Sequence, residues 1–146
     1  MDITKQRAAQ TGFLHLRGLD NQLLYEDGTD GKPDLEKKVG IHFYSPGSKQ
    51  QAAAEGRATE RALKRARDND GTPTPATPDV RRQENAEDLA AATQRLENLT
   101  YPPAGDAQGE ELFKALYADP DLGFIVSQAA KFLANWGNFK PGSVTS

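Results

Sequence analysis

Apolar residues change their spacing about one third of the way along the chain. Up to Tyr44 they occur in short stretches, at 13–17, 22–26 and 38–44, and the last of these is rich in β-branched and aromatic residues. After Ser48 they recur mainly every three or four residues, which is the spacing of an amphipathic helix. We therefore predict an α+β fold, with a small N-terminal antiparallel β-sheet followed by three to four α-helices.

The predicted sheet begins with a hairpin. The stretches 13–17 and 22–26 are separated by 18–21, where glycine, aspartate and asparagine supply turn chemistry. A loop dense in glycine, aspartate and proline follows at 27–33. The stretch 38–44 after this loop is the predicted third strand.

Two helices are predicted in the middle of the chain. Ser48 followed by Gln51 has the form of a capping box, so the first helix begins there, although its apolar residues are mostly alanines and leave it little to bury. Three prolines then predict an extended linker at 70–79. Thr77 with Pro78 at the first helical position opens the second helix. Its predicted apolar face consists of Ala86, Leu89, Ala90, Thr93, Leu96 and Leu99.

The C-terminal third carries the widest apolar stripe. A helix is predicted at 109–118, and Asp119 before Pro120 has the form of an N-cap followed by proline. Apolar residues then recur in steps of three and four up to Trp136. Two interpretations remain open, namely packing in the core and an apolar surface for a partner. The residues predicted to bind a partner are Leu122, Ile125, Phe132, Trp136 and Phe139.

These patterns divide the chain into five predicted parts. The ends are polar and short of apolar anchors, so they are predicted to be flexible. The parts are a flexible N-terminal arm at 1–12, a β-sheet plus first helix at 13–69, a Pro/Thr-rich linker at 70–79, a helical domain at 80–140 and a flexible tail at 141–146.

The residues that catalysis requires are sparse. The chain has no cysteine and lacks the motifs of phosphate-binding loops, dinucleotide folds, zinc proteases and serine hydrolases. His15 and His42 fall on separate predicted strands that share a sheet, yet a metal site would need further ligands nearby. The acidic loop with Asp27, Asp30 and Asp34 departs from the EF-hand order of ligands. We expect a protein that is not an enzyme, with no catalytic residue, no cofactor and no metal.

Charge and hydropathy restrict the partners further. The net charge of −3 is small, and the basic segment 49–67 has no aromatic residue for stacking on bases. This segment is either a solvated helix face or a binding patch, so a nucleic-acid-binding regulator stays a third alternative. No apolar stretch approaches the roughly 20 residues that span a bilayer, and the N-terminus has no signal-peptide pattern. We expect no nucleic acid and no membrane among the partners.

Two parts of the chain carry a resemblance to known proteins. The first is the stretch 38–49, KVGIHFYSPGSK, preceded by the hairpin at 14–27. The second consists of the segments 116–120, 124–128 and 132–139. The first resembles the opening of tail assembly chaperones of long-tailed (siphovirus-type) bacteriophages, where a short sheet leads through a glycine-serine turn into a charged helix, and the second resembles their closing helices. The resemblance covers somewhat more than a third of the chain and consists of packing residues and caps.

The resemblance implies an assembly factor that is absent from the virion. Such a chaperone binds the phage tape-measure protein, keeps its hydrophobic helices soluble and recruits tail-tube protein subunits, with self-association, in the host cell cytoplasm. The alternative is a structural phage minor tail or adaptor protein, because the same α+β pattern suits a subunit held in a ring. The two readings differ in whether the purified virion contains the protein.

Overall fold

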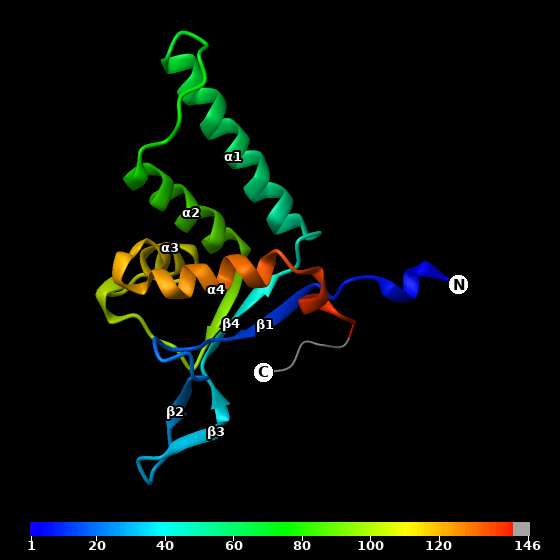
Figure 1. Cartoon of the computed structure of the whole chain (residues 1–146), viewed down its shortest axis with the longest axis vertical. Helices are drawn as coiled ribbons and strands as arrows, with labels where there is room; N and C mark the ends of the chain where they lie inside the picture. Colours follow the sequence, from blue (N-terminus) through cyan, green and yellow to red (C-terminus); the bar gives the residue numbers. More distant parts are fainter. Residues whose placement is uncertain (142–146) are drawn as a thin grey trace.

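The computed structural model describes residues 1–141, so the predicted tail lies outside the described residues except for Pro141. The α+β prediction is confirmed, since these residues form two antiparallel sheets combined with four α-helices (Figure 1). The strands are β1 (Thr11–His15), β2 (Tyr25–Asp27), β3 (Pro33–Lys38), β4 (Gly40–Tyr44) and β5 (Thr93–Glu97). The α-helices are α1 (Lys49–Asp68), α2 (Pro78–Ala92), α3 (Glu110–Ala118) and α4 (Gly123–Leu133). Short 3₁₀ turns are η1 (Ile3–Gln6), η2 (Pro102–Ala104), η3 (Pro120–Leu122) and η4 (Trp136–Phe139).

The main sheet has β4 at its centre, between β1 and β5, and both pairs are antiparallel. Phe13 of β1 stands opposite His42, and Leu96 of β5 stands opposite Ile41. Because side chains alternate along a strand, Ile41 and Phe43 point into the core while His42 lies on the other face. Burial on both faces fits the aromatic and β-branched composition that predicted this strand.

The predicted hairpin is only partly correct. The turn after Arg17 forms, and a single bridge joins Arg17 to Leu23. Beyond it the two segments separate, since β1 pairs with β4 and β2 pairs with β3 in a second sheet. They separate because the chain around fully buried Leu16 pairs with a third segment: the backbone N–H of Leu16 donates to the carbonyl of Val39 at 3.0 Å. The chain from β3 to β4 thus passes from one sheet to the other at this point.

The prediction that the second helix continues to Leu99 is wrong, because α2 ends at Ala92 and β5 follows at once. The register in β5 shifts by one residue, so that Thr93 pairs with Phe43 but Arg95 pairs with His42. This bulge places Thr93 and Leu96 on the same face of the sheet although they are three residues apart. A strand with a bulge therefore has the same three-residue spacing of core-facing residues that is typical of a helix.

The predicted helix starts are confirmed at α1 and α2. The Oγ of Ser48 accepts from the backbone N–H of Gln51 at 3.2 Å, and Thr77 caps α2 with Pro78 at the first position. Asp119 caps the short turn η3, and α4 begins only at Gly123. These side chains satisfy backbone N–H groups that a helix start leaves without an intrahelical partner.

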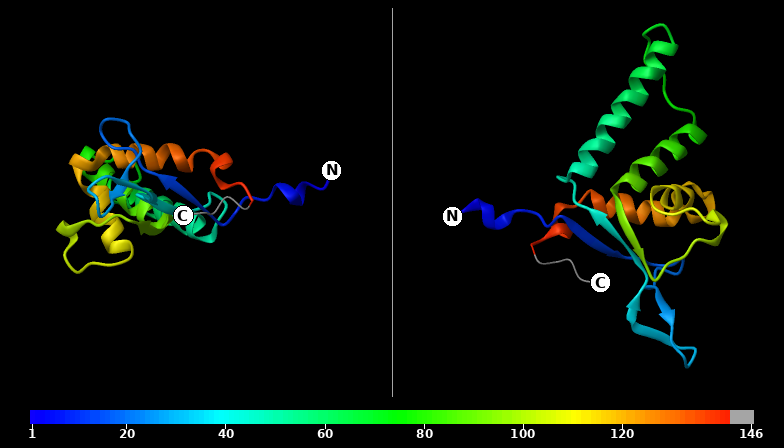
Figure 2. Two further views of the ribbon diagram at one scale, coloured as in Figure 1. Left: turned by 90° about the horizontal axis from the view of Figure 1, so that it is seen from below. Right: turned by 180° about the vertical axis from the view of Figure 1, so that it is seen from behind.

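One hydrophobic core joins both sides of the predicted linker. It contains strand residues, the C-terminal half of α2, and the inner faces of α3 and α4. Helix α4 lies beside β1 in the views of Figures 1 and 2, and Gln128 of α4 is hydrogen-bonded to the backbone of Arg17 just after β1. The core residues include Leu16, Val39, Ile41, Phe43, Ala86, Leu89, Ala90, Phe113, Leu116, Tyr117, Ile125, Ala129 and Phe139. The predicted segments 13–69 and 80–140 thus contribute to the same core.

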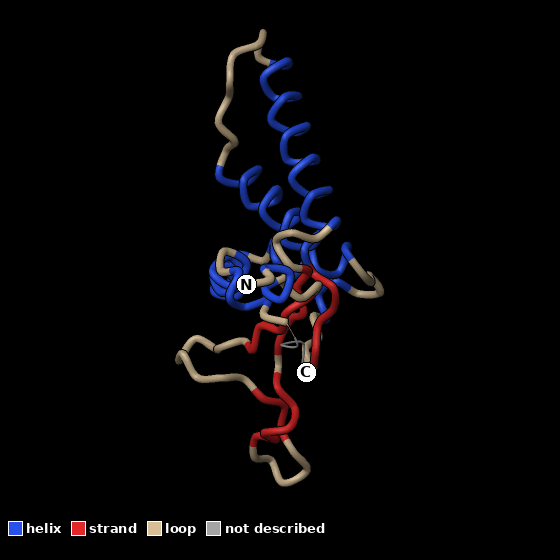
Figure 3. Tube along the Cα trace, turned by 90° about the vertical axis from the view of Figure 1, so that its right-hand side faces the viewer, coloured by secondary structure: helices blue, strands red, loops and turns tan. Residues whose placement is uncertain are grey.

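Three segments project from this core. The outer parts of α1 and α2 extend at one end of the molecule, and the β2–β3 sheet extends at the other, below the main sheet (Figure 3). The N-terminal segment leads away to the side, with Met1 and Ile3 exposed (Figure 1). Strand β1 begins at Thr11, inside the segment predicted as a flexible arm. The residues from Asp70 to Pro78 are exposed apart from half-buried Ala76.

Candidate functional site

The five residues predicted to bind a partner do not share one surface. Ile125 and Phe139 are 4% and 0% exposed, so both belong to the core of the folded chain. Leu122 and Phe132 are half-buried and pack against that core. Only Trp136 is largely exposed, at 58%. The prediction of direct partner contact therefore narrows to Trp136, and core packing accounts for most of the stripe.

An aromatic cluster connects this end of the chain to the sheet. The ring centroids of Phe43 and Phe132 are 5.8 Å apart, and those of Phe132 and Phe139 are 5.3 Å apart. Gly12 of β1 makes room for Phe139, because a Cβ at position 12 would stand 3.0 Å from its ring and 2.7 Å from the carbonyl oxygen of Asn138. These contacts fix η4, which carries Trp136, against β1.

Trp136 sits where α4 ends and α1 begins. Asn135 caps η4 by accepting from the backbone N–H of Gly137 at 2.9 Å. The indole lies against the turn before α1, since a Cβ at Gly47 would be 3.1 Å from Cη2 of Trp136. The ring is thus held on one side by backbone and open to solvent on the other, an arrangement that suits an anchor for a partner.

The helix α1 has little contact with the rest of the molecule. Of its 20 residues only Ala54 is buried, and Leu63 is 58% exposed. A hollow of about 950 Å³ lies beside Leu63, between α1 and the start of the following loop. Its lining consists of Arg57, Glu60, Arg61, Leu63, Lys64, Ala66, Arg67, Gly71 and Glu87.

Ion pairs rather than apolar contacts connect the outer parts of α1 and α2. Arg61 reaches Glu84, Glu87 and Asp88, with its Nη2 donating to Asp88 Oδ1 at 2.7 Å, and Arg65 also pairs with Glu84. Partial burial lowers the pKa of Arg61, but the hydrogen bonds and charges of Asp88, Glu84 and Glu87 outweigh this and raise it above its usual value. The basic segment predicted from the sequence is therefore partly neutralised by α2.

Four other basic side chains of that segment stay exposed. Within residues 1–141 no carboxylate lies within 4.0 Å of Lys49, Arg57, Lys64 or Arg67. They lie on α1 at positions that leave them in solvent. The structure thus leaves a cationic surface on α1 and uses Arg61 and Arg65 for packing against α2.

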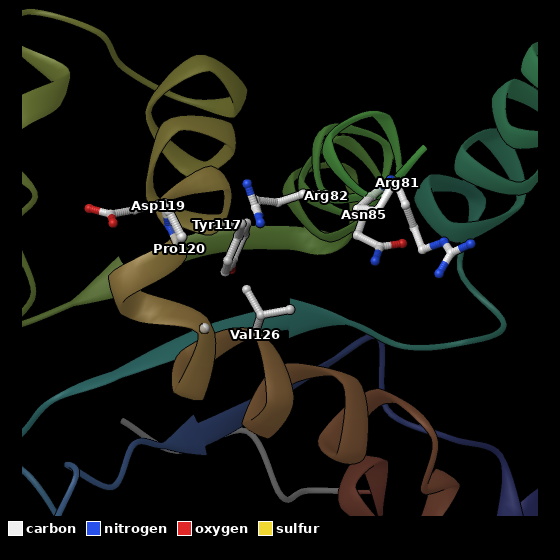
Figure 4. A pocket seen from close by; sticks show the side chains of 9 residues that line it. Arg81, Arg82, Asn85, Tyr117, Asp119, Pro120 and Val126 are labelled. Atoms are coloured by element: carbon white, nitrogen blue, oxygen red, sulfur yellow. The ribbon is translucent and has the colours of Figure 1, made fainter. Parts of the chain in front are cut away.

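A smaller hollow of about 320 Å³ separates the first half of α2 from the turn between α3 and α4 (Figure 4). Arg81, Arg82 and Asn85 line it from α2, whereas Tyr117 and Val126 line it from the other side (Figure 4). Pro78, Asp119, Pro120 and Gly123 complete the lining. Sequence reasoning missed this site, because its two sides come from helices separated by the β5 strand and two loops.

The hydroxyl of Tyr117 is not available for chemistry in this hollow. Thr93 Oγ1 donates to the carbonyl of Leu89 at 2.7 Å and lies 2.6 Å from the Tyr117 hydroxyl, which therefore donates to it. Burial raises the pKa of Tyr117 above its ordinary value, although the hydrogen bond with Thr93 opposes the rise. Tyr117 therefore contributes an aromatic wall and not an acid or base.

The two histidines share a sheet face but form no metal site. His42 is buried, its Nε2 lies 3.4 Å from Glu97 Oε1, and the ring of Phe13 covers it at a centroid distance of 4.7 Å. His15 Nε2 instead lies 2.8 Å from the carbonyl oxygen of Leu24. Within residues 1–141 no three His, Asp or Glu side chains are grouped so as to hold a metal ion.

The acidic loop is explained by turn formation. Asp30 accepts from the backbone N–H of Lys32, and Asp34 accepts from that of Glu36, each at 3.0 Å. These side chains stabilise the loop between β2 and β3 and the start of β3.

Within residues 1–141, no helix has both the length and the apolar character needed to cross a membrane.

Searches of protein-family models, of curated proteins and of solved structures found no match to this chain.

Proposed function

We propose that this protein is a tail assembly chaperone of a siphovirus-type bacteriophage and acts by binding proteins, without catalysis. In this proposal it holds the tape-measure protein soluble in the host cell cytoplasm and brings tail-tube subunits to it. The resemblance at 38–49 and in the segments 116–120, 124–128 and 132–139 supports the assignment, and the exposure of Trp136 is the observation that carries it. A large aromatic side chain, 58% exposed and held against Gly47, has the character of a binding anchor.

The second support for the proposal is α1. A helix of 20 residues with one buried side chain gains little from packing in its own chain. A helical partner would cover Leu63 and the stems of the exposed basic side chains. Tape-measure proteins are long and largely helical, so their helices have the shape that such a surface accepts. Self-association through the same surface would compete with tape-measure binding.

The mass-spectrometric composition of purified virions tests this proposal against the structural alternative. A chaperone is made in infected cells and is absent from virions, whereas a minor tail or adaptor protein is present in fixed copy number. We expect peptides of this chain in infected-cell lysate and none in gradient-purified virions at the sensitivity that detects the tape-measure protein. A constant ratio of this chain to tail-tube protein in virions would instead establish the structural role.

A further inference from the structure

The hollow between α2 and the α3–α4 turn has an apolar wall and a cationic rim. Tyr117, Pro120 and Val126 form the wall on the side of α3 and α4 (Figure 4). The rim on α2 consists of Arg81, Arg82 and Asn85, which are all exposed. The volume of about 320 Å³ lies at the lower end of the range for small-molecule pockets. This volume suits one large side chain.

The rim is positive because its cations are poorly neutralised. Within the described residues Arg81 has no carboxylate within 4.0 Å, and Arg82 has only Asp79, at 3.5 Å and 88% exposed. Asp119 is the acidic residue in the lining, and its oxygens accept from the Tyr101 hydroxyl at 2.8 Å and from the N–H of Asp121 at 3.0 Å. Its side chain also points away from the hollow (Figure 4).

The two guanidinium groups point to different places. Arg82 extends toward Tyr117, whereas Arg81 extends away from Arg82, past Asn85 (Figure 4). The two cations therefore suit two anionic groups placed on different sides of the hollow. Two acidic side chains on either side of an inserted apolar residue would reach both, and Arg–carboxylate pairs are the strongest polar contacts available here. The separation of the arginines therefore favours an internal segment over a C-terminus.

We propose that this hollow binds a peptide segment of a partner protein in which one large apolar side chain is flanked on both sides by aspartate or glutamate. The apolar side chain packs on exposed Pro120 and half-buried Val126, next to the buried ring of Tyr117, and the flanking carboxylates pair with Arg81 and Arg82. This site is separate from Trp136 and α1, and it does not depend on a role in phage tail assembly.

The probes are three short synthetic peptides, acetylated and amidated, with a central tryptophan, phenylalanine or leucine flanked by glutamates. Each has a counterpart with glutamines in place of the glutamates. Affinities for the full-length chain are measured by fluorescence anisotropy at low salt and again at about 0.5 M salt. We expect at least one glutamate peptide to bind, its glutamine counterpart to bind about tenfold more weakly, and added salt to weaken the binding.

Gly123 offers a variant that fills the hollow without straining the backbone. It lines the hollow, its φ of −57° is helical, and a Cβ added there meets no atom within 4 Å. We expect Gly123→Leu to weaken peptide binding about tenfold. Gly56→Leu is the matched control, because Gly56 is also helical with open space around it but lies in α1, outside the lining. It should bind the peptide as the parent does.

The arginines are tested together with Arg81→Gln and Arg82→Gln. We expect this double variant to lose the preference for glutamate over glutamine while it keeps the circular dichroism spectrum of the parent. Any of three results overturns the proposal: no saturable binding of any peptide up to about 1 mM, equal affinity for the glutamate and glutamine peptides, or unchanged binding by Gly123→Leu.

Discussion

The hydroxyls of Thr93 and Tyr117 are 2.6 Å apart inside the core, where the first residue of β5 meets the last turn of α3. Both side chains are buried, so water does not replace a lost partner easily. The pair therefore connects the end of α2, where Thr93 also donates to the carbonyl of Leu89, with α3, which lines the hollow beside Arg81 and Arg82. Its strength is measurable.

We expect Tyr117→Phe to lower the free energy of unfolding by about 1 kcal/mol, because one buried hydrogen bond is lost while the ring and the Thr93–Leu89 bond remain. Urea unfolding followed by circular dichroism measures the loss. Tyr44→Phe is the control, since the half-buried Tyr44 hydroxyl has no hydrogen-bond partner among the described residues, and it should change stability little. Equal stability of Tyr117→Phe and the parent would show that the pair contributes nothing.

Phe139→Ala and Trp136→Ala should behave differently although they are three residues apart. Phe139 is fully buried against Phe132 and Gly12, so its truncation should lower the free energy of unfolding by about 3–5 kcal/mol. Trp136 is 58% exposed, so its truncation should cost about 1 kcal/mol or less. Thermal unfolding of the two variants side by side measures the difference. Equal destabilisation would contradict the placement of Trp136 at the surface.

We expect Arg61→Ala to destabilise the contact between α1 and α2. Its guanidinium joins three carboxylates of α2 in a partly exposed network, so a loss of about 1–2 kcal/mol is expected at low salt, decreasing at about 1 M salt. Arg57→Ala, which removes no ion pair, is the control. Hydrogen exchange of the α1 amides reports the effect locally. Unchanged protection of α1 in Arg61→Ala would refute the contribution of the network.

His42 should make the fold less stable as pH falls. Burial is the main cause that lowers the pKa of His42, Arg95 lowers it further, and Glu97 opposes both. The unfolded chain therefore takes up a proton at His42 near its ordinary pKa of about 6.5, before the folded chain does. The contribution of neutral His42 to the free energy of unfolding is fully present above that pH. It decreases as pH falls from about 7 toward the lowered pKa of His42 in the folded state. The measurement is the urea midpoint between about pH 7.5 and 5.5, where His42→Asn should show a smaller decrease than the parent.

The sequence predicted those features that depend on neighbours along the chain. The cap at Ser48, the proline start at Pro78 and the central strand β4 follow from local residue types and are confirmed. Strand β5 did not follow, because its bulge gives Thr93 and Leu96 a helix-like spacing and its pairing partner is more than fifty residues away. Tertiary pairing with the free edge of β4 overrides the local pattern there.

In the candidate site, too, the sequence predicted the local pattern but not the features that depend on tertiary packing. An apolar stripe ending in Trp136 was visible in the sequence, but the pattern does not distinguish side chains that face the protein's own sheet from those that face solvent. Phe139 follows a break in helical structure at Asn135, and its burial depends on the space that Gly12 provides in β1. The hollow beside Arg81 and Arg82 required the packing of α2 against α3 and α4, which no local pattern encodes.

The solubility of a tape-measure fragment co-expressed with this chain is the most direct measure of the proposed function. The fragment is produced alone, with the parent chain, with Trp136→Ala and with Leu19→Ala, the last as a control because Leu19 is 86% exposed in a turn. We predict that the parent and Leu19→Ala keep the fragment soluble and co-purify with it, whereas Trp136→Ala stays folded but leaves most of it in the pellet. A fragment that is equally insoluble with and without the parent chain, while the chain itself is folded and soluble, would contradict the account.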